Sequence, residues 1–293
     1  MKKLLILSGK GGSGKTTTAA AFIRFSGAKA VADCDVDAPN LHLVMDTWAM
    51  PMETPFLGAD KAYIEPDCCV GCGKCAQHCR FGAIRREGDK YRVEETACEG
   101  CGVCVEVCPQ EAVDLAPDVA GYQALYLGEQ TFSTAQLRMG RGNSGKLVTA
   151  VKQSLFGAAP EAELAVIDGS PGVGCPVIAS VNGVDLVLIV AEPSLSGRSD
   201  MERVLKTAEI LGARAAVCVN KYDSSLRNTE AIEDYCRERG IPFVGRVPYD
   251  KHASQAIDQG RSLADYDCPA RDALYRVYQD TMALLASDGA EKP

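Results

Sequence analysis

Short apolar runs alternate with stretches of helical spacing near the start of the chain and again after residue 120. The apolar runs, each as long as a buried strand, cover residues 4–7, 29–32, 164–167, 185–190 and 215–219. The helix-like stretches cover residues 15–25, 200–211, 230–239 and 271–286. This rhythm predicts an α/β fold with a mostly parallel sheet and helices on both of its faces.

The region from about residue 61 to residue 116 interrupts this rhythm and contains a repeat. Nine of the fourteen cysteines lie in it, and four of them recur 29 residues later: Cys69, Cys72, Cys75 and Cys79 are followed by Cys98, Cys101, Cys104 and Cys108. A duplicated module inside an α/β pattern indicates an insertion. We therefore predict an inserted domain at residues 59–119 and a discontinuous larger domain formed by residues 1–58 and 120–293.

A glycine-rich octet directly follows the first predicted strand. It matches the phosphate-loop pattern G-x-x-x-x-G-K-S/T with Gly9-Lys10-Gly11-Gly12-Ser13-Gly14-Lys15-Thr16. Glycines let successive backbone N–H groups turn toward phosphate oxygens, and the following helix presents its N-terminus to the same anion. Lys15 is expected to reach the β- and γ-phosphates, and the Thr16 hydroxyl is expected to ligate Mg²⁺. The nucleotide-binding residues predicted here are Gly11, Gly12, Ser13, Gly14, Lys15, Thr16 and Thr17.

The second lysine of this loop, Lys10, gives it the form K-G-G-x-G-K-T. This form resembles the deviant phosphate loop of the MinD/ParA/Mrp family, which includes the nitrogenase iron protein, and the resemblance covers most of residues 1–50 and 121–293. It implies an ATPase fold, Mg²⁺-dependent hydrolysis of ATP, and a homodimer in which Lys10 reaches the nucleotide of the other subunit. The alternative for Lys10 is an ordinary solvated loop lysine.

Two further segments are similar to the switch motifs of that family. Asp33-x-Asp35 ends the second predicted strand, and the resemblance implies that Asp35 orients the attacking water. Asp168 ends the apolar run 164–167, and the resemblance places it beside the magnesium ion. It also implies that the backbone N–H of Gly172 binds the γ-phosphate. Ordinary helix caps or turns are the alternative for single strand-end aspartates.

The base-binding residues are predicted by resemblance alone. Asn220 follows one apolar run, and Pro248 lies just after another, at the positions that line the adenine pocket in the family. Asn220 is expected to pair with the edge of the base. The alternative is ordinary turn chemistry at the end of a strand.

Both cysteine runs have the spacing C-x₂-C-x₂-C-x₃-C, which is typical of cubane iron–sulfur clusters. In two-cluster ferredoxins the fourth cysteine of each run ligates the other cluster. We therefore predict two 4Fe–4S clusters, one held by Cys69, Cys72, Cys75 and Cys108 and the other by Cys98, Cys101, Cys104 and Cys79. The segment resembles the small α+β bacterial-type ferredoxins, although Arg80 stands where these usually have proline. Two four-cysteine zinc sites are the alternative.

The remaining cysteines are expected to be small buried hydrophobic residues, with one exception. Cys175 lies seven residues after Asp168. The nitrogenase iron protein has a cluster-ligating cysteine at the matching place, so the resemblance leaves a metal or cluster ligand at a dimer face open beside the buried-thiol interpretation.

Composition narrows the classes of function. The formal net charge of −8 does not favour nucleic-acid binding, which needs clustered Lys and Arg. No apolar run is long enough to span a membrane, and the apolar core of the N-terminus, residues 4–7, is too short for an export signal. We expect a cytoplasmic protein that binds neither nucleic acid nor membrane.

The combination of motifs suggests a function that couples two modules. The main hypothesis is that ATP hydrolysis gates electron transfer from the clusters, or delivery of metal or Fe–S cofactor, to a partner protein. The arrangement resembles ATPases of the MinD superfamily with an inserted ferredoxin domain. The alternative is a spatial-positioning ATPase like MinD or ParA whose clusters are structural or sensory. An Mrp-type scaffold is less favoured, because no C-x-x-C pair follows residue 108.

Overall fold

The computed structural model describes residues 1–45 and 50–287. Its main sheet has nine strands in the order β13-β12-β11-β1-β10-β2-β9-β8-β3. The strands are β1 Lys2–Leu7, β2 Ala30–Asp33, β3 Met52–Leu57, β8 Val119–Tyr126, β9 Thr131–Leu137, β10 Leu164–Asp168, β11 Leu186–Ala191, β12 Arg214–Asn220 and β13 Phe243–Val247. Every pairing from β13 across to β9 is parallel. The predicted fold class, a mostly parallel α/β sheet, is confirmed.

The other edge of the sheet is built differently. Residues 127–130 join β8 to its neighbour β9, which is too short for a parallel crossover, so this pair is antiparallel. β3 follows as the outermost strand. The first four residues of β3 are all exposed, so its sequence shows little of the alternation between apolar and polar residues that marks a half-buried strand.

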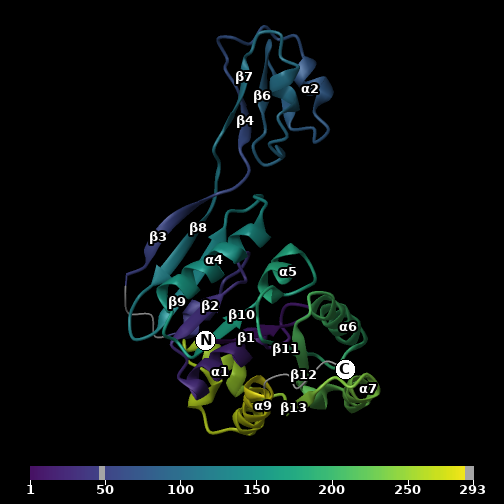
Figure 1. The fold of residues 1–293 in the computed structure, drawn as a ribbon. Helices are drawn as coiled ribbons and strands as arrows, with labels where there is room; N and C mark the ends of the chain where they lie inside the picture. The colour runs from purple at the N-terminus through teal and green to yellow at the C-terminus, as the bar shows by residue number, and fades with distance from the viewer. Residues whose placement is uncertain (46–49, 288–293) are drawn as a thin grey trace. The chain divides into compact units, whose positions relative to one another are not determined.

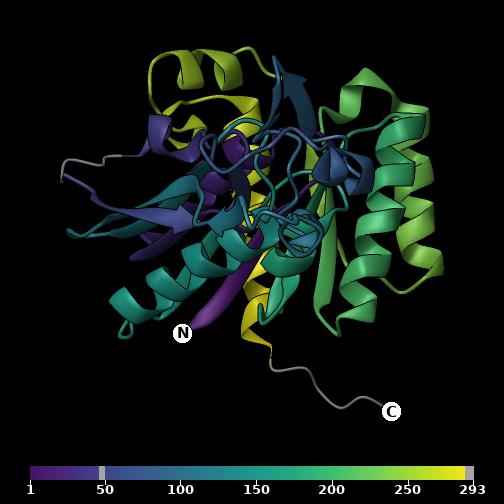
Figure 2. The same ribbon diagram turned by 90° about the horizontal axis from the view of Figure 1, so that it is seen from above.

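Helices cover both faces of the sheet (Figure 1). The helices of this part of the chain are α1 Lys15–Ser26, α4 Ser144–Ala158, α5 Cys175–Val181, α6 Leu195–Ile210, α7 Leu226–Glu238, α8 His252–Asp258 and α9 Pro269–Ala286. α1 and α9 pack together on one face, where Phe22 and Tyr278 meet edge to face. α4, α5 and α6 lie on the other face, and α6 and α7 run side by side over β12 in both views (Figure 2).

The central strands are buried on both sides, which explains their continuous apolar sequences. All six residues of β11 are buried. Leu4, Ile6 and Leu188 contribute to the core shared with α1 and α9. Within the described part of the chain, no helix combines the length and the apolar character needed to cross a membrane.

The chain divides into two compact units. One comprises residues 1–53, 124–135 and 144–293, and the other comprises residues 54–123 and 136–143. The insertion predicted at residues 59–119 falls within the second unit. Its second segment, residues 136–143, carried no signal in the sequence.

The second unit is a small α+β structure with two antiparallel sheets of two strands each. β4 Lys61–Ile64 pairs with β7 Val113–Ala116, and β5 Ile84–Glu87 pairs with β6 Lys90–Val93. The short helices α2 Lys74–His78 and α3 Val103–Glu106 lie within the two cysteine runs, and each contains the third cysteine of its run, Cys75 or Cys104. Its small core consists largely of cysteine, alanine and branched aliphatic side chains.

Candidate nucleotide and iron–sulfur sites

The glycine-rich loop connects β1 to α1 in a conformation that needs glycine. Gly12 and Gly14 have φ values of 79° and 94°, which other residues rarely adopt. A Cβ atom on Gly14 would also lie 2.1 Å from the amide nitrogen of Asn220. Gly14 is the N-cap residue of α1, so the loop leads directly into Lys15, the first residue of that helix.

A cavity of about 610 Å³ opens over this loop. It is lined by most of the residues predicted to bind nucleotide: Lys10, Gly11, Gly12, Ser13, Gly14, Lys15, Thr16, Thr17, Asp35, Asn220 and Pro248. Asp168 lies beneath Lys15 and Thr16. Gly172 is not part of the lining, and its N–H donates to the carbonyl oxygen of Ser8 at 3.0 Å. A γ-phosphate could receive this N–H only after that bond breaks.

Lys15 lies close to three carboxylates. Its Nζ donates to Asp168 Oδ1 at 2.6 Å and lies 4.0 Å from Asp35 Oδ2. Burial lowers the pKa of Lys15, but the nearby Asp168, Asp33 and Asp35 outweigh it, so the pKa is raised overall. The Thr16 hydroxyl donates to the second Asp168 oxygen at 2.7 Å. Thr16, Asp35 and Asp168 thus gather the oxygen ligands that a hard cation such as Mg²⁺ prefers.

The loop also carries a buried hydroxyl with no partner. Ser13 is 2% exposed, and its Oγ makes no hydrogen bond within the described part of the chain. Buried polar atoms normally have partners. A phosphate oxygen bound in the loop would supply an acceptor, so the cradle fits the triphosphate that the motif predicts.

Asp33 fixes the segment that carries Asp35. Its carboxylate accepts backbone N–H bonds from Asp35 at 3.0 Å, Asn40 at 3.0 Å and Leu41 at 2.9 Å. Burial raises the pKa of Asp33 to about 7, assisted by the negative charge of Asp168. The sequence analysis assigned the orientation of the attacking water to Asp35. It did not predict that Asp33 holds the segment of residues 35–41 in place.

This pKa predicts how the stability of the nucleotide-free protein changes with pH. Between about pH 4 and about pH 7 the folded chain keeps a proton on Asp33 that the unfolded chain has released, so stability falls as pH rises through this window. Asp33→Asn should remove this decrease, on the order of 2–4 kcal/mol. Denaturant unfolding of both proteins at several pH values measures it. If the free energy of unfolding changed with pH in the same way in both proteins, the prediction would be contradicted.

Three contacts around the cavity were not predicted. Lys10 Nζ pairs with Glu192 Oε2 of the same chain at 2.6 Å, and both side chains are partly exposed. Asn220 donates its amide to the Ser13 carbonyl at 2.8 Å, so it braces the loop. Lys221 donates to the Gly12 carbonyl at 3.0 Å. Glu192 follows the buried strand β11, so the rule that polar residues after parallel strands gather at one edge could have found it.

The eight cysteines of the two runs line two separate cavities in the second unit. Cys69, Cys72, Cys75 and Cys108 line one, and Cys79, Cys98, Cys101 and Cys104 line the other. These are the two sets of four that the sequence analysis assigned to the two clusters. Cys68 lies next to Cys69 but lines neither cavity and is exposed.

The two cavities are related by the 29-residue repeat. Backbone N–H groups approach the sulfur atoms at matching positions, from Ala83 to Cys79 at 3.4 Å and from Ala112 to Cys108 at 3.3 Å. Ala62 makes a further such bond to Cys98 at 3.4 Å. Hydrogen bonds to cysteine sulfur are among the features that tune iron–sulfur clusters. Four thiols around each cavity and N–H groups aimed at sulfur fit two cubane clusters.

Most of the other cysteines are buried in the core. Burial raises the pKa of Cys34, Cys218 and Cys236, which makes their thiols poor nucleophiles and poor ligands. Cys175 differs because it is exposed at the first position of α5. It belongs to neither four-cysteine cavity.

A third group of potential ligands is explained without a metal. Asp250, His252 and Cys268 bring their ligand atoms within 4.8 Å of one another. Asp250 already accepts bonds from the backbone N–H and ring of His252, at 3.0 and 2.7 Å, and from the N–H of Ala270 at 3.5 Å. The carboxylate thus ties the starts of α8 and α9 together, a capping role that satisfies its oxygens.

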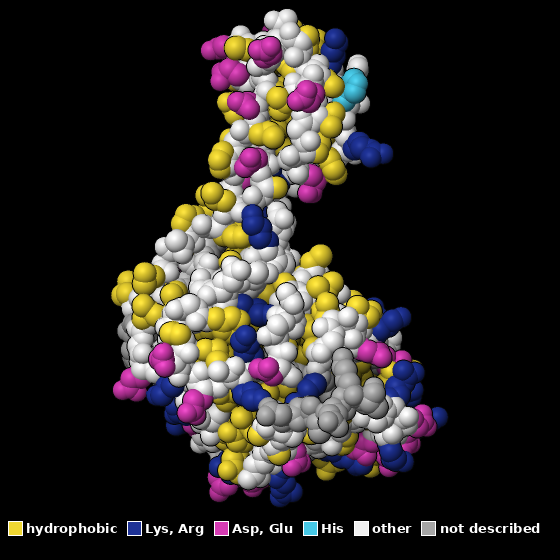
Figure 3. All heavy atoms as spheres, in the orientation of Figure 1, with side chains coloured by type: hydrophobic (Ala, Val, Ile, Leu, Met, Phe, Trp, Pro, Cys, Tyr) yellow, Lys and Arg dark blue, Asp and Glu magenta, His cyan; other side chains and the backbone are white. Residues whose placement is uncertain are grey.

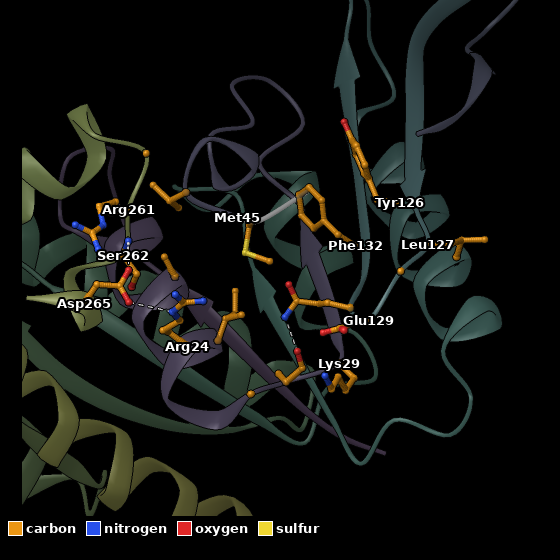
Figure 4. A pocket seen from close by; sticks show the side chains of 18 residues that line it. Arg24, Lys29, Met45, Tyr126, Leu127, Glu129, Phe132, Arg261, Ser262 and Asp265 are labelled. Carbon is orange, nitrogen blue, oxygen red and sulfur yellow. Dashed lines mark hydrogen bonds and ion pairs between the residues drawn. The ribbon is translucent and has the colours of Figure 1, made fainter. Parts of the chain in front are cut away.

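Another cavity, of about 920 Å³, touches none of the predicted site residues. It lies at the C-terminal end of α1, between the β8–β9 connection and the segment after α8 (Figure 4). Arg24 and Asp265 form an ion pair of 3.0 Å at its border, and Phe132 and Met45 give it an apolar side. Its size alone does not make it the active site, because the phosphate loop lies at the opposite end of α1.

Comparisons with known proteins agree with this geometry. A protein of Methanocaldococcus jannaschii with no assigned function is 34% identical over 284 residues, which are 94% of this chain and 95% of the relative. A cytosolic Fe–S cluster assembly factor of Drosophila melanogaster, a Nubp1 homologue, is 22% identical over 97% of this chain and 82% of its own. The fold is similar to that of the cell-division ATPase MinD of Pyrococcus furiosus, with a TM-score of 0.59, 17% identity and coverage of 97% and 99% of the two chains.

The family itself is shown by a sequence model rather than by any one relative. The model of the CobQ/CobB/MinD/ParA nucleotide-binding domain matches residues 4–263. This range contains the phosphate loop, Asp35, Asp168 and Asn220. The chain therefore belongs to the CobQ/CobB/MinD/ParA family of nucleotide-binding ATPases.

Proposed function

We propose that this protein uses ATP binding and hydrolysis to control two 4Fe–4S clusters that act on a partner protein. The observation that carries the proposal is the presence, in one chain, of a phosphate-loop cavity and two cavities lined by four cysteines each. The control takes one of two forms, electron transfer to the partner or assembly of a metal or Fe–S cofactor on it.

The residues of the nucleotide cavity divide the work of hydrolysis. The loop N–H groups and Lys15 bind the phosphates, Asp35 orients the attacking water, and Thr16 and Asp168 would hold Mg²⁺. Mg²⁺ supplies neutralisation of the charge that develops on the phosphates. Lys15 pairs with Asp168 at 2.6 Å and lies 4.0 Å from Asp35, so a bound phosphate would replace a carboxylate as its partner.

The same site can report whether a γ-phosphate is present. Gly172 donates to Ser8 across the end of the cavity, and its φ of 95° lets the segment after Asp168 turn sharply. A γ-phosphate that captures this N–H would break the bond and displace the segment. A segment with two arrangements is the element that a nucleotide cycle needs.

Lys10, the second lysine of the phosphate loop, supports a homodimer in this proposal. Lys10 lines the cavity but is held by Glu192, so its ammonium is not committed to a nucleotide of its own chain. Release from Glu192 would free it to reach a nucleotide in a second copy. Hydrolysis would then depend on assembly as well as on ATP.

The charged side chains of the second unit are unevenly distributed (Figure 3). On the face in Figure 3, most acidic side chains of this unit lie on one side, whereas Lys, Arg and His side chains lie on the other. Glu99 lines the cavity of the second run, where the repeat places Val70 in the first. Negative charge near a cluster disfavours the reduced form, so the two clusters should differ in reduction potential.

One experiment separates the two forms of the proposal. The cluster-loaded protein is incubated with MgATP and a candidate partner without metal, and iron is then measured in both proteins after separation. Electron transfer leaves about eight irons on this chain. Cofactor assembly moves iron to the partner, as the relationship to an Fe–S assembly factor favours. Zinc bound in place of iron in the protein as purified would contradict both.

A spatial-positioning ATPase is the second candidate, since the fold is that of MinD. α9 packs against the core of this part of the chain. Leu274, Val277 and Leu285 are buried on its inner side. The buried side of α9 is therefore not a surface for binding lipid.

A further inference from the structure

We propose that α4 transmits the state of the nucleotide site to the second cysteine loop, with Lys152 and Arg141 as the positioning residues that connect it at its two ends. The inference rests on the proposed function, because it names the part of the chain through which the nucleotide cycle would reach the cysteines. Neither residue lines the nucleotide cavity or either cysteine cavity.

The path begins at α5, the helix that follows Asp168 and Gly172 in the sequence. Residues 169–174 connect Asp168 at the end of β10 to the start of α5. Gly172 lies in this connection and is bonded to Ser8 of the phosphate loop. A rearrangement at Gly172 must therefore displace the N-terminal end of α5.

Lys152 of α4 fastens the opposite end of α5. Its side chain is 5% exposed, and its Nζ donates to the carbonyl oxygens of Ala179 at 2.9 Å, Ser180 at 2.7 Å and Asn182 at 2.6 Å. These are carbonyls at a helix C-terminus, which lack intrahelical partners and carry partial negative charge. The ammonium group uses all three of its donors on them.

α4 also touches the beginning of α5. A Cβ atom on Gly145 would lie 3.1 Å from the carbonyl oxygen of Cys175, so the two backbones approach each other closely there. Contacts at both ends of α5 mean that α4 must follow when α5 moves.

The N-terminal end of α4 continues into the second unit. Residues 136–143 precede the helix and belong to that unit. Within the unit Arg141 is nearly buried and pairs with Asp118 at 3.0 Å and with Glu95 at 2.9 Å. It also donates to the Glu95 carbonyl at 3.0 Å. The Asp118 side chain is 10% exposed, so losing the cation would leave a nearly buried carboxylate without its partner, which is costly. The Glu95 carboxylate is exposed, and Arg141 holds this residue through its backbone carbonyl as well.

The anchor of Arg141 lies at the start of the second cysteine loop. Glu95 precedes Cys98 by three residues, and the N–H of Cys98 donates to Glu94 at 3.1 Å in the same turn. A shift of Arg141 therefore displaces the turn that positions Cys98. The proposed series of contacts thus runs from the γ-phosphate position through α5, Lys152, α4 and Arg141 to one ligand of the second predicted cluster.

Hydrogen–deuterium exchange of the cluster-loaded protein tests this path. Exchange is compared between MgADP and Mg²⁺ with a non-hydrolysable ATP analogue. In the wild-type protein the analogue should change exchange about fivefold or more at residues 171–182 and at residues 94–104, the lower range of typical site-to-site coupling. Lys152→Met should keep the response at 171–182 and lose the response at 94–104. Arg141→Met should do the same, and it decides the matter if the first variant does not fold.

Gln153→Met is the matched control, because Gln153 is the exposed neighbour of Lys152 on α4. It should respond as the wild type does at both segments. If both test variants keep the response at 94–104, the path through α4 is overturned while nucleotide control of the cysteine unit stands, and strands β3, β8 or β9 carry it. If the wild type itself shows no response at 94–104, the proposed function fails together with the path.

Discussion

Lys15→Ala should reduce ATP hydrolysis by about 10³-fold or more, the usual cost of losing a group that stabilises charge on a transferring phosphoryl group. The side chain is buried at the start of α1 and faces three aspartates. Its loss removes the cation that binds the β- and γ-phosphates and also leaves Asp168 without its partner at 2.6 Å. Steady-state release of phosphate under MgATP measures the effect.

Lys206→Ala provides the control for this variant. Lys206 is an exposed lysine of α6 that does not line the nucleotide cavity. It should hydrolyse ATP at the wild-type rate. If Lys15→Ala turned over as fast as Lys206→Ala, the phosphate loop would not be the site of hydrolysis.

Two double variants should lower the iron–sulfur content to different extents. Cys69 and Cys108 come from different runs but line one cavity, whereas Cys98 and Cys108 come from one run but line different cavities. Cys69→Ala with Cys108→Ala should therefore remove one cluster and leave about four irons and four sulfides. Cys98→Ala with Cys108→Ala should remove both clusters and leave almost no iron.

Iron and acid-labile sulfide analysis after anaerobic reconstitution gives the result directly. Cys68→Ala is the control, because this exposed cysteine lines neither cavity and its loss should leave about eight irons. The opposite pattern, with four irons kept by Cys98→Ala and Cys108→Ala and none by the other pair, would mean that each run holds its own cluster.

The parts that sequence predicted well are those whose cause is local. β1, β10 and β11 are buried on both faces, so their residues had to be apolar in unbroken runs. The phosphate loop is contiguous, since every group that wraps an anion comes from one turn and one helix start. The grouping of cysteines also follows from spacing, because a tight loop can present three thiolates to one cluster.

The parts that sequence missed depend on partners far along the chain. β3 is an exposed edge strand whose existence depends on its neighbour β8. Arg141 has no periodic or motif signal, and its importance comes only from its contacts with Asp118 and Glu95. Lys152 lies in α4, a helix that the sequence analysis did not predict, and the carbonyls that it binds lie 27 to 30 residues away. Such contacts are products of packing rather than of local pattern.

The most direct test of nucleotide control is an anaerobic redox titration of the cluster-loaded protein with and without MgATP, followed by electron paramagnetic resonance. MgATP should shift at least one cluster potential by about 40 mV or more, which corresponds to a coupling of about 1 kcal/mol for a one-electron step. Lys15→Ala should show no shift. Unchanged potentials in the wild-type protein at saturating MgATP would contradict the claim that the ATPase governs its clusters.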